Sequence, residues 1–218
     1  MNNTDQNIAR EKFLYCCKTY IKRPGLDSLL EYLEQKTDFF HAPSSVSYHL
    51  NEEGGLVQHA VNVFECALTI YDQVIQPAIQ KGTSPFTEEV DIESIAVSAL
   101  FHDVCKTNIY KKKQKWRKDE YNHWESYDGY EIEDNFPFGH GEKSCFIIST
   151  FMKLKQCELL AIRWHMGMFE MTDVGSNGRF AYRAAMEKSP LVALLQAADM
   201  LSANCLEKTS IPPATAHH

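Results

Sequence analysis

The chain has 218 residues, of which 44% are hydrophobic and 23% charged, and its formal net charge is −7. These totals are typical of one globular domain, and the acidic balance disfavours general binding along a nucleic-acid backbone. No apolar run approaches the roughly 18 residues that a membrane span needs. The polar start, residues 1–10, lacks the apolar core of a signal peptide, and the seven cysteines contain no Cys-x-x-Cys pair. We therefore expect a cytoplasmic protein with reduced thiols.

Two amphipathic helices are predicted at the start of the chain. The first spans residues 7–22, and Pro24-Gly25 interrupts it before the second begins at Leu26. We assign residues 1–36 to an N-terminal helical extension. It would pack on the following domain or form part of a subunit contact, and we assign no chemistry to it.

A long helix is predicted from Gly54-Gly55 to about residue 80. Leu56 and His59 lie on one face of this helix, so His59 points toward the core. Taken alone, such a histidine is more often a satisfied core residue than a ligand. Pro77 falls in the last part of the run and is expected to kink or end the helix.

The next predicted helix carries Ile95, Ala99 and His102 at helical spacing, with Asp103 beside His102 and Lys106 three residues further on. His102 therefore lies on the buried face near the helix end. An Asp carboxylate in an apolar helix costs several kcal/mol unless something compensates it, and a metal ion would do so. Neutral imidazole and carboxylate are both good ligands for divalent cations.

An aromatic, charged insertion is predicted at about residues 108–138, where the helical stripe gives way to strand-forming residues. We interpret it as a β-hairpin or two short ribbons. Residues 111–118 hold six basic residues of eight, and residues 119–134 hold seven acidic ones. The two halves would form cross-strand charge pairs, or the basic half would act as a flap that attracts a phosphorylated ligand. These two interpretations are compatible.

Three further polar residues stand in predicted helical contexts after the insertion. His140 lies between glycines near a helix start, His165 lies near a helix end, and Asp199 follows Ala198 in the last long helix. An unpaired aspartate at that position would be costly. The remaining predicted segments are helices at 158–166, 180–187 and from residue 190, a loop at 167–178 and a disordered tail at 209–218.

Six residues with metal-ligand chemistry thus stand in one helical domain. They are His59, His102, Asp103, His140, His165 and Asp199. Each alone is more often structural than catalytic, but six together are hard to explain as satisfied core residues.

The sequence resembles the HD-domain metal-dependent phosphohydrolases over roughly residues 50–207. The motifs that carry the resemblance are Gly55-Leu56-x-x-His59, His102-Asp103-x-x-Lys106, Gly139-His140, Trp164-His165-x-Gly167 and Ala198-Asp199. Their order is that of the subgroups with two metals. The chain is most similar to stand-alone bacterial hydrolases and to the HD domain of bacterial 3′-to-5′ exoribonucleases. The resemblance implies an all-α fold, an HD-domain helical bundle over residues 37–208, and the hairpin-like insertion departs from a minimal domain of this kind.

The resemblance also implies residue roles. His59, His102, Asp103 and Asp199 match the ligands of a first metal, and His140 and His165 match those of a second, with Asp103 bridging. We expect two divalent transition-metal ions drawn from Mn, Fe, Co, Ni and Zn, because imidazole-rich sites favour these over Mg. Two such ions about 4 Å apart can activate water for an in-line phosphoryl displacement.

Four side chains outside the ligand set are candidates for substrate contacts. Lys106 and Lys143 would neutralise phosphate oxygens, Lys106 acting with Asp103 in catalysis, unless they are surface lysines at helix ends. Trp116 and Trp124, together with Phe138, would stack on a base or form the hairpin's own small core.

The expected function is hydrolysis of a phosphoester of a nucleotide or small nucleotide-like substrate by metal-activated water. A 3′-to-5′ exonuclease acting on single-stranded nucleic acid is an alternative, weakened by the net acidity. A non-catalytic nucleotide-sensing module is another, and the intact six-ligand set argues against it. The expected partner is a phosphorylated small molecule, with no membrane, nucleic acid not favoured and a homo-oligomer left open.

Overall fold

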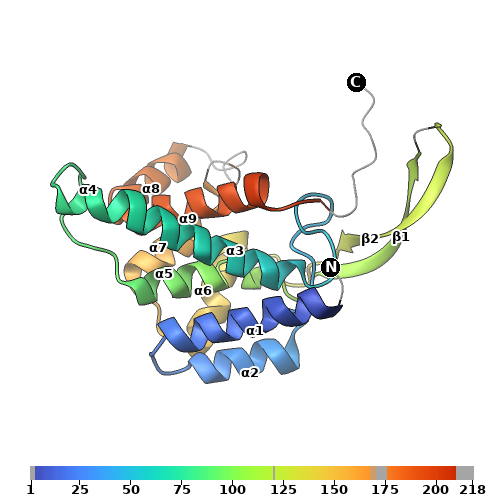
Figure 1. Ribbon diagram of the computed structural model, residues 1–218, viewed down its shortest axis with the longest axis horizontal. Helices are drawn as coiled ribbons and strands as arrows, with labels where there is room; N and C mark the ends of the chain where they lie inside the picture. Colours follow the sequence, from blue (N-terminus) through green and yellow to red (C-terminus); the bar gives the residue numbers. More distant parts are fainter. Residues whose placement is uncertain (1–2, 120, 168, 170–175, 210–218) are drawn as a thin grey trace.

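The computed structural model describes residues 3–119, 121–167, 169 and 176–209 (Figure 1). The tail predicted beyond residue 209 and most of the loop predicted at 167–178 lie outside these residues. The described helical segments are α1 Asn3–Tyr20, α2 Leu26–Lys36, α3 Gly55–Ile70, the π-helical η1 Tyr71–Ile75, α4 Gln76–Gln80, α5 Ile92–Phe101, the 3-10 turn η2 Val104–Lys106, α6 His140–Phe151, α7 Gln156–Trp164, α8 Ser176–Met186, α9 Pro190–Leu201 and the π-helical η4 Ser202–Leu206.

Helix α3 lies at the centre of the bundle and packs against α1, α5 and α9, while α7 packs against α6 and α9 (Figure 1). The apolar stripe predicted for α3 is the reason, since Leu56, Val63 and Phe64 are all buried in one continuous core. The predicted all-α class is therefore confirmed. None of the helices in the described part of the chain combines the length and apolarity that a membrane crossing needs.

The N-terminal helices share this core with the helices that follow them. The fully buried ring of Phe13 in α1 lies 5.0 Å from that of Phe39 and 5.7 Å from that of Phe101, centroid to centroid. Between α1 and α2, the Arg23 guanidinium lies 2.7 Å from Glu158 in α7 and 3.1 Å from Glu93 in α5. These contacts hold the ends of α5 and α7 in a fixed relation, which matters because both helices lead into the site.

The long helix predicted to about residue 80 changes its winding before Pro77. The segment Tyr71–Ile75 is π-helical, and α4 continues the same rod from Gln76 with Pro77 in its first turn. Proline has no N–H to donate to the preceding turn, and a wider turn accommodates that missing bond. The disturbance predicted at this proline thus appears as a π-helical stretch within a continuing helix.

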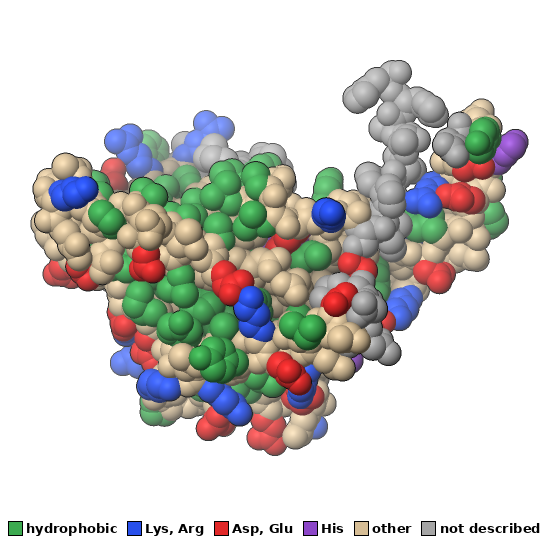
Figure 2. Space-filling model, in the orientation of Figure 1, with side chains coloured by type: hydrophobic (Ala, Val, Ile, Leu, Met, Phe, Trp, Pro, Cys, Tyr) green, Lys and Arg blue, Asp and Glu red, His purple; other side chains and the backbone are tan. Residues whose placement is uncertain are grey.

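The insertion is a two-stranded antiparallel hairpin, as predicted, and it projects from the bundle as an arm (Figure 1). Strand β1, Tyr110–Lys118, pairs with β2, Trp124–Ile132. Only the base is well buried, where the Tyr110 hydroxyl donates to the carbonyl of Ser44 at 3.2 Å. Further out, basic and acidic side chains intersperse on the arm (Figure 2), and Arg117 lies 2.5 Å from Glu125 across the strands. The predicted cross-strand charge pairing is therefore present.

Candidate metal centre

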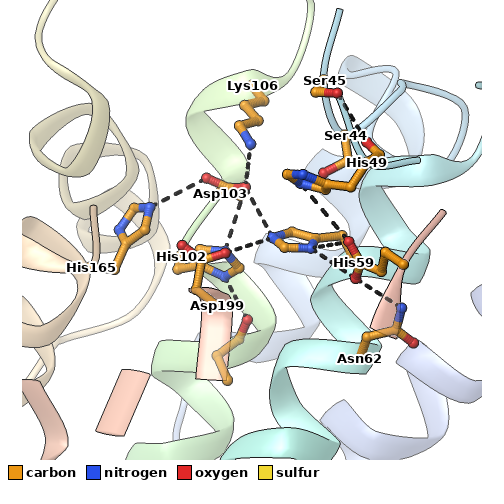
Figure 3. Close-up of polar contacts among 12 residues, drawn as sticks. Ser44, Ser45, His49, His59, Asn62, His102, Asp103, Lys106, His165 and Asp199 are labelled. Atoms are coloured by element: carbon orange, nitrogen blue, oxygen red, sulfur yellow. Dashed lines mark hydrogen bonds and ion pairs between the residues drawn. The ribbon is translucent and has the colours of Figure 1, made fainter. Parts of the chain in front are cut away.

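The six predicted ligands converge at one end of the bundle, although they come from five helical elements (Figure 3 labels five of them). His102 and Asp103 follow the last turn of α5, and His165 follows the last turn of α7. His59 projects from α3, His140 from the first turn of α6 and Asp199 from α9. All but His140 and Asp199 are buried outright, and those two are partly buried.

Asp103 is the centre of this arrangement. Its Oδ2 atom lies 3.6 Å from His59 Nε2 and 3.4 Å from His102 Nε2. Its Oδ1 atom lies 2.8 Å from His140 Nε2 and 3.5 Å from His165 Nε2. The two oxygens of one carboxylate therefore face two different pairs of imidazoles.

Asp199 completes the group on the Oδ2 side. Its Oδ1 atom lies 3.1 Å from His59 Nε2 and 4.0 Å from His102 Nε2. These distances place His59 and His102 in a first group with Asp103 and Asp199, and His140 and His165 in a second group with Asp103. His102, His165 and Asp199 also lie close enough together to share an ion, so the two groups adjoin. The assignment of these groups to two separate metals, which the sequence resemblance implied, stays a prediction.

Three of the imidazoles are fixed with Nε2 directed at the carboxylates. The Nδ1–H groups of His102 and His165 donate to the carbonyls of Ala99 and Ile162, at 2.8 and 2.7 Å. Both carbonyls belong to the last turn of a helix, where no intrahelical donor is left for them. His59 Nδ1–H donates to a carboxylate instead, that of Glu207, at 3.0 Å.

The Nε2 atoms of His59, His102 and His165 are buried and have no hydrogen-bond partner. Buried polar atoms rarely lack a partner, and three such lone pairs directed at two carboxylates suit a cation. Four imidazoles with two carboxylates form a donor set for divalent transition metals. The residues present therefore fit the predicted metal site.

The charge states of these side chains follow from their burial and from their charged neighbours. Burial would raise the pKa of Asp103, but the cation of Lys106 holds it well below its usual range. Burial likewise opposes ionisation of Asp199, and the neighbouring imidazole of His59 outweighs this and lowers its pKa. Burial lowers the pKa of His102 to about 4. At neutral pH the carboxylates are charged and His102 is neutral, which are the forms that bind metal. Burial would lower the pKa of His59, but the carboxylates of Asp199 and Glu207 outweigh it and raise this pKa to about 10, so a metal ion would have to displace a proton there.

The two predicted lysines are both largely buried, so neither is a surface residue. Lys106 lies in the turn after Asp103, and its Nζ is 2.6 Å from Asp103 Oδ2. Lys143, one turn after His140 in α6, has its Nζ 2.6 Å from Asp134 and lines a separate cavity of about 340 Å³ beside His140.

A larger pocket, of about 410 Å³, opens onto Lys106, His165 and Asp199. Its other walls combine apolar side chains with amides, and are formed by Tyr48, Met166, Phe169, Gln196, Met200 and Asn204 among others. The sequence reasoning missed these residues, because nothing in their local pattern marks them as neighbours of the metal centre.

The aromatic residues predicted to contact substrate do not line this pocket. Trp116 and Trp124 lie on the projecting arm with 60% and 66% of their surfaces exposed. Phe138 stacks on Phe136, with ring centroids 5.3 Å apart, and both contact Phe146 of α6. The role of these aromatics in substrate binding stays a prediction.

Comparison with known proteins identifies the family. The sequence model of the HD domain matches residues 56–204, which include all six converging residues. The chain belongs to the HD-domain family. HD domains bind divalent metals, and the predicted family is confirmed.

One curated relative of this HD-domain protein is the dihydroneopterin 2′,3′-cyclic phosphate phosphodiesterase of Methanocaldococcus jannaschii. The two are 32% identical over 80 residues, which cover 37% of this chain and 29% of the relative. The matched stretch is thus well under two thirds of either protein. No solved structure matches the chain.

Proposed function

We propose that this HD-domain protein is a metal-dependent phosphohydrolase that cleaves a phosphoester of a nucleotide or small nucleotide-like molecule. The observation that carries the proposal is the arrangement of four imidazoles in two pairs, each of which faces one oxygen of Asp103. His59, His102, Asp103 and Asp199 would hold one ion, and Asp103, His140 and His165 a second. Divalent ions bound there would polarise a phosphoryl oxygen and make water a better nucleophile.

Lys106 supplies the nearest positive charge of the chain itself. Its Nζ pairs with Asp103, and its side chain is 15% exposed where it lines the larger pocket. When the carboxylate is engaged by metal, this ammonium group is free to stabilise the phosphate oxygens of a substrate. Lys106 is therefore the proposed phosphate-binding residue.

Lys143, Trp116 and Trp124 are the other proposed substrate contacts. Lys143 lines the cavity beside His140, and its charge is already paired with Asp134. The tryptophans would act only on a ligand that extends out of the pocket toward the arm. Their contribution stays a prediction.

The larger pocket supports a small organic substrate. A volume of about 410 Å³ lies within the range of small-molecule sites. Tyr48, Phe169 and Met200 offer apolar surface for a heterocycle, and Gln196 and Asn204 offer amides that could bind its polar edge. The M. jannaschii relative acts, by its name, on a cyclic phosphate of dihydroneopterin, which supports the same class of substrate.

A hydrolysis panel tests the proposal. The purified protein, loaded with Mn²⁺, is incubated with nucleoside monophosphates, nucleoside triphosphates, 2′,3′-cyclic nucleotides and a single-stranded oligonucleotide. We expect chelator-sensitive hydrolysis of at least one mononucleotide. Cleavage confined to the oligonucleotide would support the exonuclease alternative, and binding without hydrolysis would support a sensing module. Either result would overturn the proposal.

A further inference from the structure

A buried carboxylate lies behind the metal centre, on the Nδ1 side of His59. It belongs to Glu207, whose side chain is only 1% exposed. Glu207 follows the π-helical segment Ser202–Leu206 and stands beyond residue 204, where the HD-domain match ends. It is thus outside the segment that the family match covers.

Glu207 is held by polar contacts from two positions of α3. Both of its carboxylate oxygens lie 3.0 Å from His59 Nδ1, and Oε1 accepts a hydrogen bond from Asn62 Nδ2 at 2.9 Å. Asn62 stands one turn after His59, so both side chains project from the same face of the helix. The imidazole of His49 packs on the ring of His59 at 4.9 Å, with its Nε2 3.9 Å from Glu207 Oε2.

The backbone around Glu207 fixes the position of its carboxylate. The N–H of Leu50 donates to the carbonyl of Lys208 at 2.9 Å, which ties the segment after η4 to the loop that carries His49. Glu207 N–H donates to the carbonyl of Ser202 at 3.1 Å. The C-terminal segment therefore places a carboxylate against His59, a histidine that lies 148 residues earlier in the sequence.

His59 differs in this respect from the other three histidines of the centre. His102 and His165 donate from Nδ1 to neutral backbone carbonyls, and His140 Nδ1 lies 3.3 Å from the sulfur of Cys105. Only His59 has a carboxylate on that nitrogen, among the contacts of the described residues. An anionic acceptor fixes the imidazole tautomer and makes Nε2 a stronger electron donor.

We propose that Glu207 is a positioning residue that orients His59 and strengthens its bond to a divalent ion at the first group of ligands. The inference rests on the proposed metal centre. Glu207 contacts the nitrogen of His59 opposite to the one that faces Asp103 and Asp199, so it is not itself a ligand of that ion. Through Glu207, the last described segment of the chain becomes a part of the metal centre.

The Glu207→Gln variant isolates the charge. Glutamine keeps an acceptor oxygen where Oε1 meets both Asn62 and His59, so the hydrogen bonds can persist while the negative charge is lost. Calorimetric titration of chelator-treated protein with Mn²⁺ should show one of two ions bound about 10- to 100-fold more weakly, and the other unchanged. Glu187→Gln, which removes a carboxylate that is 66% exposed, is the matched control and should titrate like wild type.

A second comparison tests whether Glu207 acts through His59. In a His59→Ala background, the added Glu207→Gln change should weaken Mn²⁺ binding no further. The melting temperature of metal-free Glu207→Gln protein should stay close to that of wild type, whereas the rise on adding Mn²⁺ should shrink. A variant that loses stability equally with and without metal, or that binds both ions as wild type does, would overturn the inference.

Asn62→Ala provides an independent variant if Glu207→Gln does not fold. It removes one support of the carboxylate and should weaken the same ion, by a smaller factor. Unchanged Mn²⁺ binding in Asn62→Ala would then contradict the inference. Wild-type protein that binds no Mn²⁺ would instead refute the proposed metal centre itself, so the two failures are distinguishable.

Discussion

The metal centre and the hairpin arm differ in how their charged groups are satisfied. In the centre, carboxylates and imidazoles are buried, and three Nε2 atoms have no hydrogen-bond partner. On the arm, charges are exposed and neutralise one another, as in the contacts of Lys113 with Glu131 and Arg117 with Glu125. Burying polar groups without partners is costly, whereas exposed ion pairs contribute little either way.

A high density of charged residues in the sequence is therefore a poor guide to the position of the metal centre. The run of basic residues at 111–118 is conspicuous, yet several of its charges are matched across the hairpin or, for Lys112, by Glu53 at 3.1 Å. The four histidines of the centre are scattered over more than 100 positions and become conspicuous only when the fold gathers them.

Replacing the shared carboxylate should have the largest effect. Asp103→Ala removes the carboxylate whose two oxygens face the two pairs of imidazoles, so we expect loss of bound metal and a fall in kcat/KM of roughly 10³-fold or more. The protein should stay folded, because an unpaired buried charge disappears with the metal. Metal analysis, circular dichroism and the hydrolysis rate measure the loss of metal, the retention of the fold and the loss of activity, respectively.

The arm provides the control for this change. Asp128→Ala removes an exposed carboxylate of β2, and wild-type turnover is expected. Wild-type turnover in Asp103→Ala would mean that the site of hydrolysis lies elsewhere.

Removing the buried cation beside the metals should have the next largest effect. Lys106→Met keeps the length of the side chain and deletes its charge, so kcat/KM should fall by about 10²-fold. The number of bound ions should not fall, because Lys106 is a partner of Asp103 and not a ligand. Loss of metal together with activity would assign Lys106 a structural role in place of phosphate binding.

Reversing charge on the arm should have a smaller effect. If the basic strand attracts anionic substrates, changing Lys112, Lys113 and Lys115 to Glu should raise the KM for a nucleotide a few-fold, and less at high salt because exposed charges are screened beyond about 8 Å at physiological ionic strength. Hydrolysis of a small aryl phosphate should change little. Equal responses of both substrates, or none, would leave the arm a structural or subunit-contact element.

A surface ion pair at the far end of α5 should show the smallest effect. Asp91 caps α5 by accepting from Glu93 N–H, and its hydrogen bond with Lys155 lowers its pKa. A lowered pKa means that the unfolded chain binds the proton more tightly, so this stabilisation is present above the unfolded pKa of about 3.9 and is lost as the pH falls further.

Asp91→Asn keeps the cap and deletes the charge. Urea unfolding of chelator-treated protein should show a loss of about 0.5 kcal/mol at pH 7. The difference from wild type should shrink as the pH approaches 3. A difference that persists unchanged at low pH would show that the cap geometry, and not the charge, was altered.

The sequence predicted those parts of the molecule whose signals are local. Helical spacing placed His59 and His102 on buried faces, and strand-forming residues with opposite charges identified the hairpin. Boundaries were less accurate, since α8 begins at Ser176 and not near residue 180. Its first turn holds Asn177 and Gly178, which favour caps and turns over helix interiors.

The groups behind the ligands could not be predicted from local pattern. Glu207 stands in a segment with no motif and no apolar period, and its partner His59 is 148 residues away. Tyr48 and Phe169 line the pocket from short segments between the long helices. Such contacts depend on how the loops fold over the helices, which periodicity does not encode.

Anomalous diffraction from crystals of Mn²⁺-saturated protein tests the dinuclear centre most directly. We expect two peaks, one on each side of the Asp103 carboxylate. One should lie within bonding distance of His59, His102 and Asp199, and the other within bonding distance of His140 and His165. A single peak in a saturated crystal, with His140 and His165 directed elsewhere, would contradict the dinuclear centre and leave one metal at the first group.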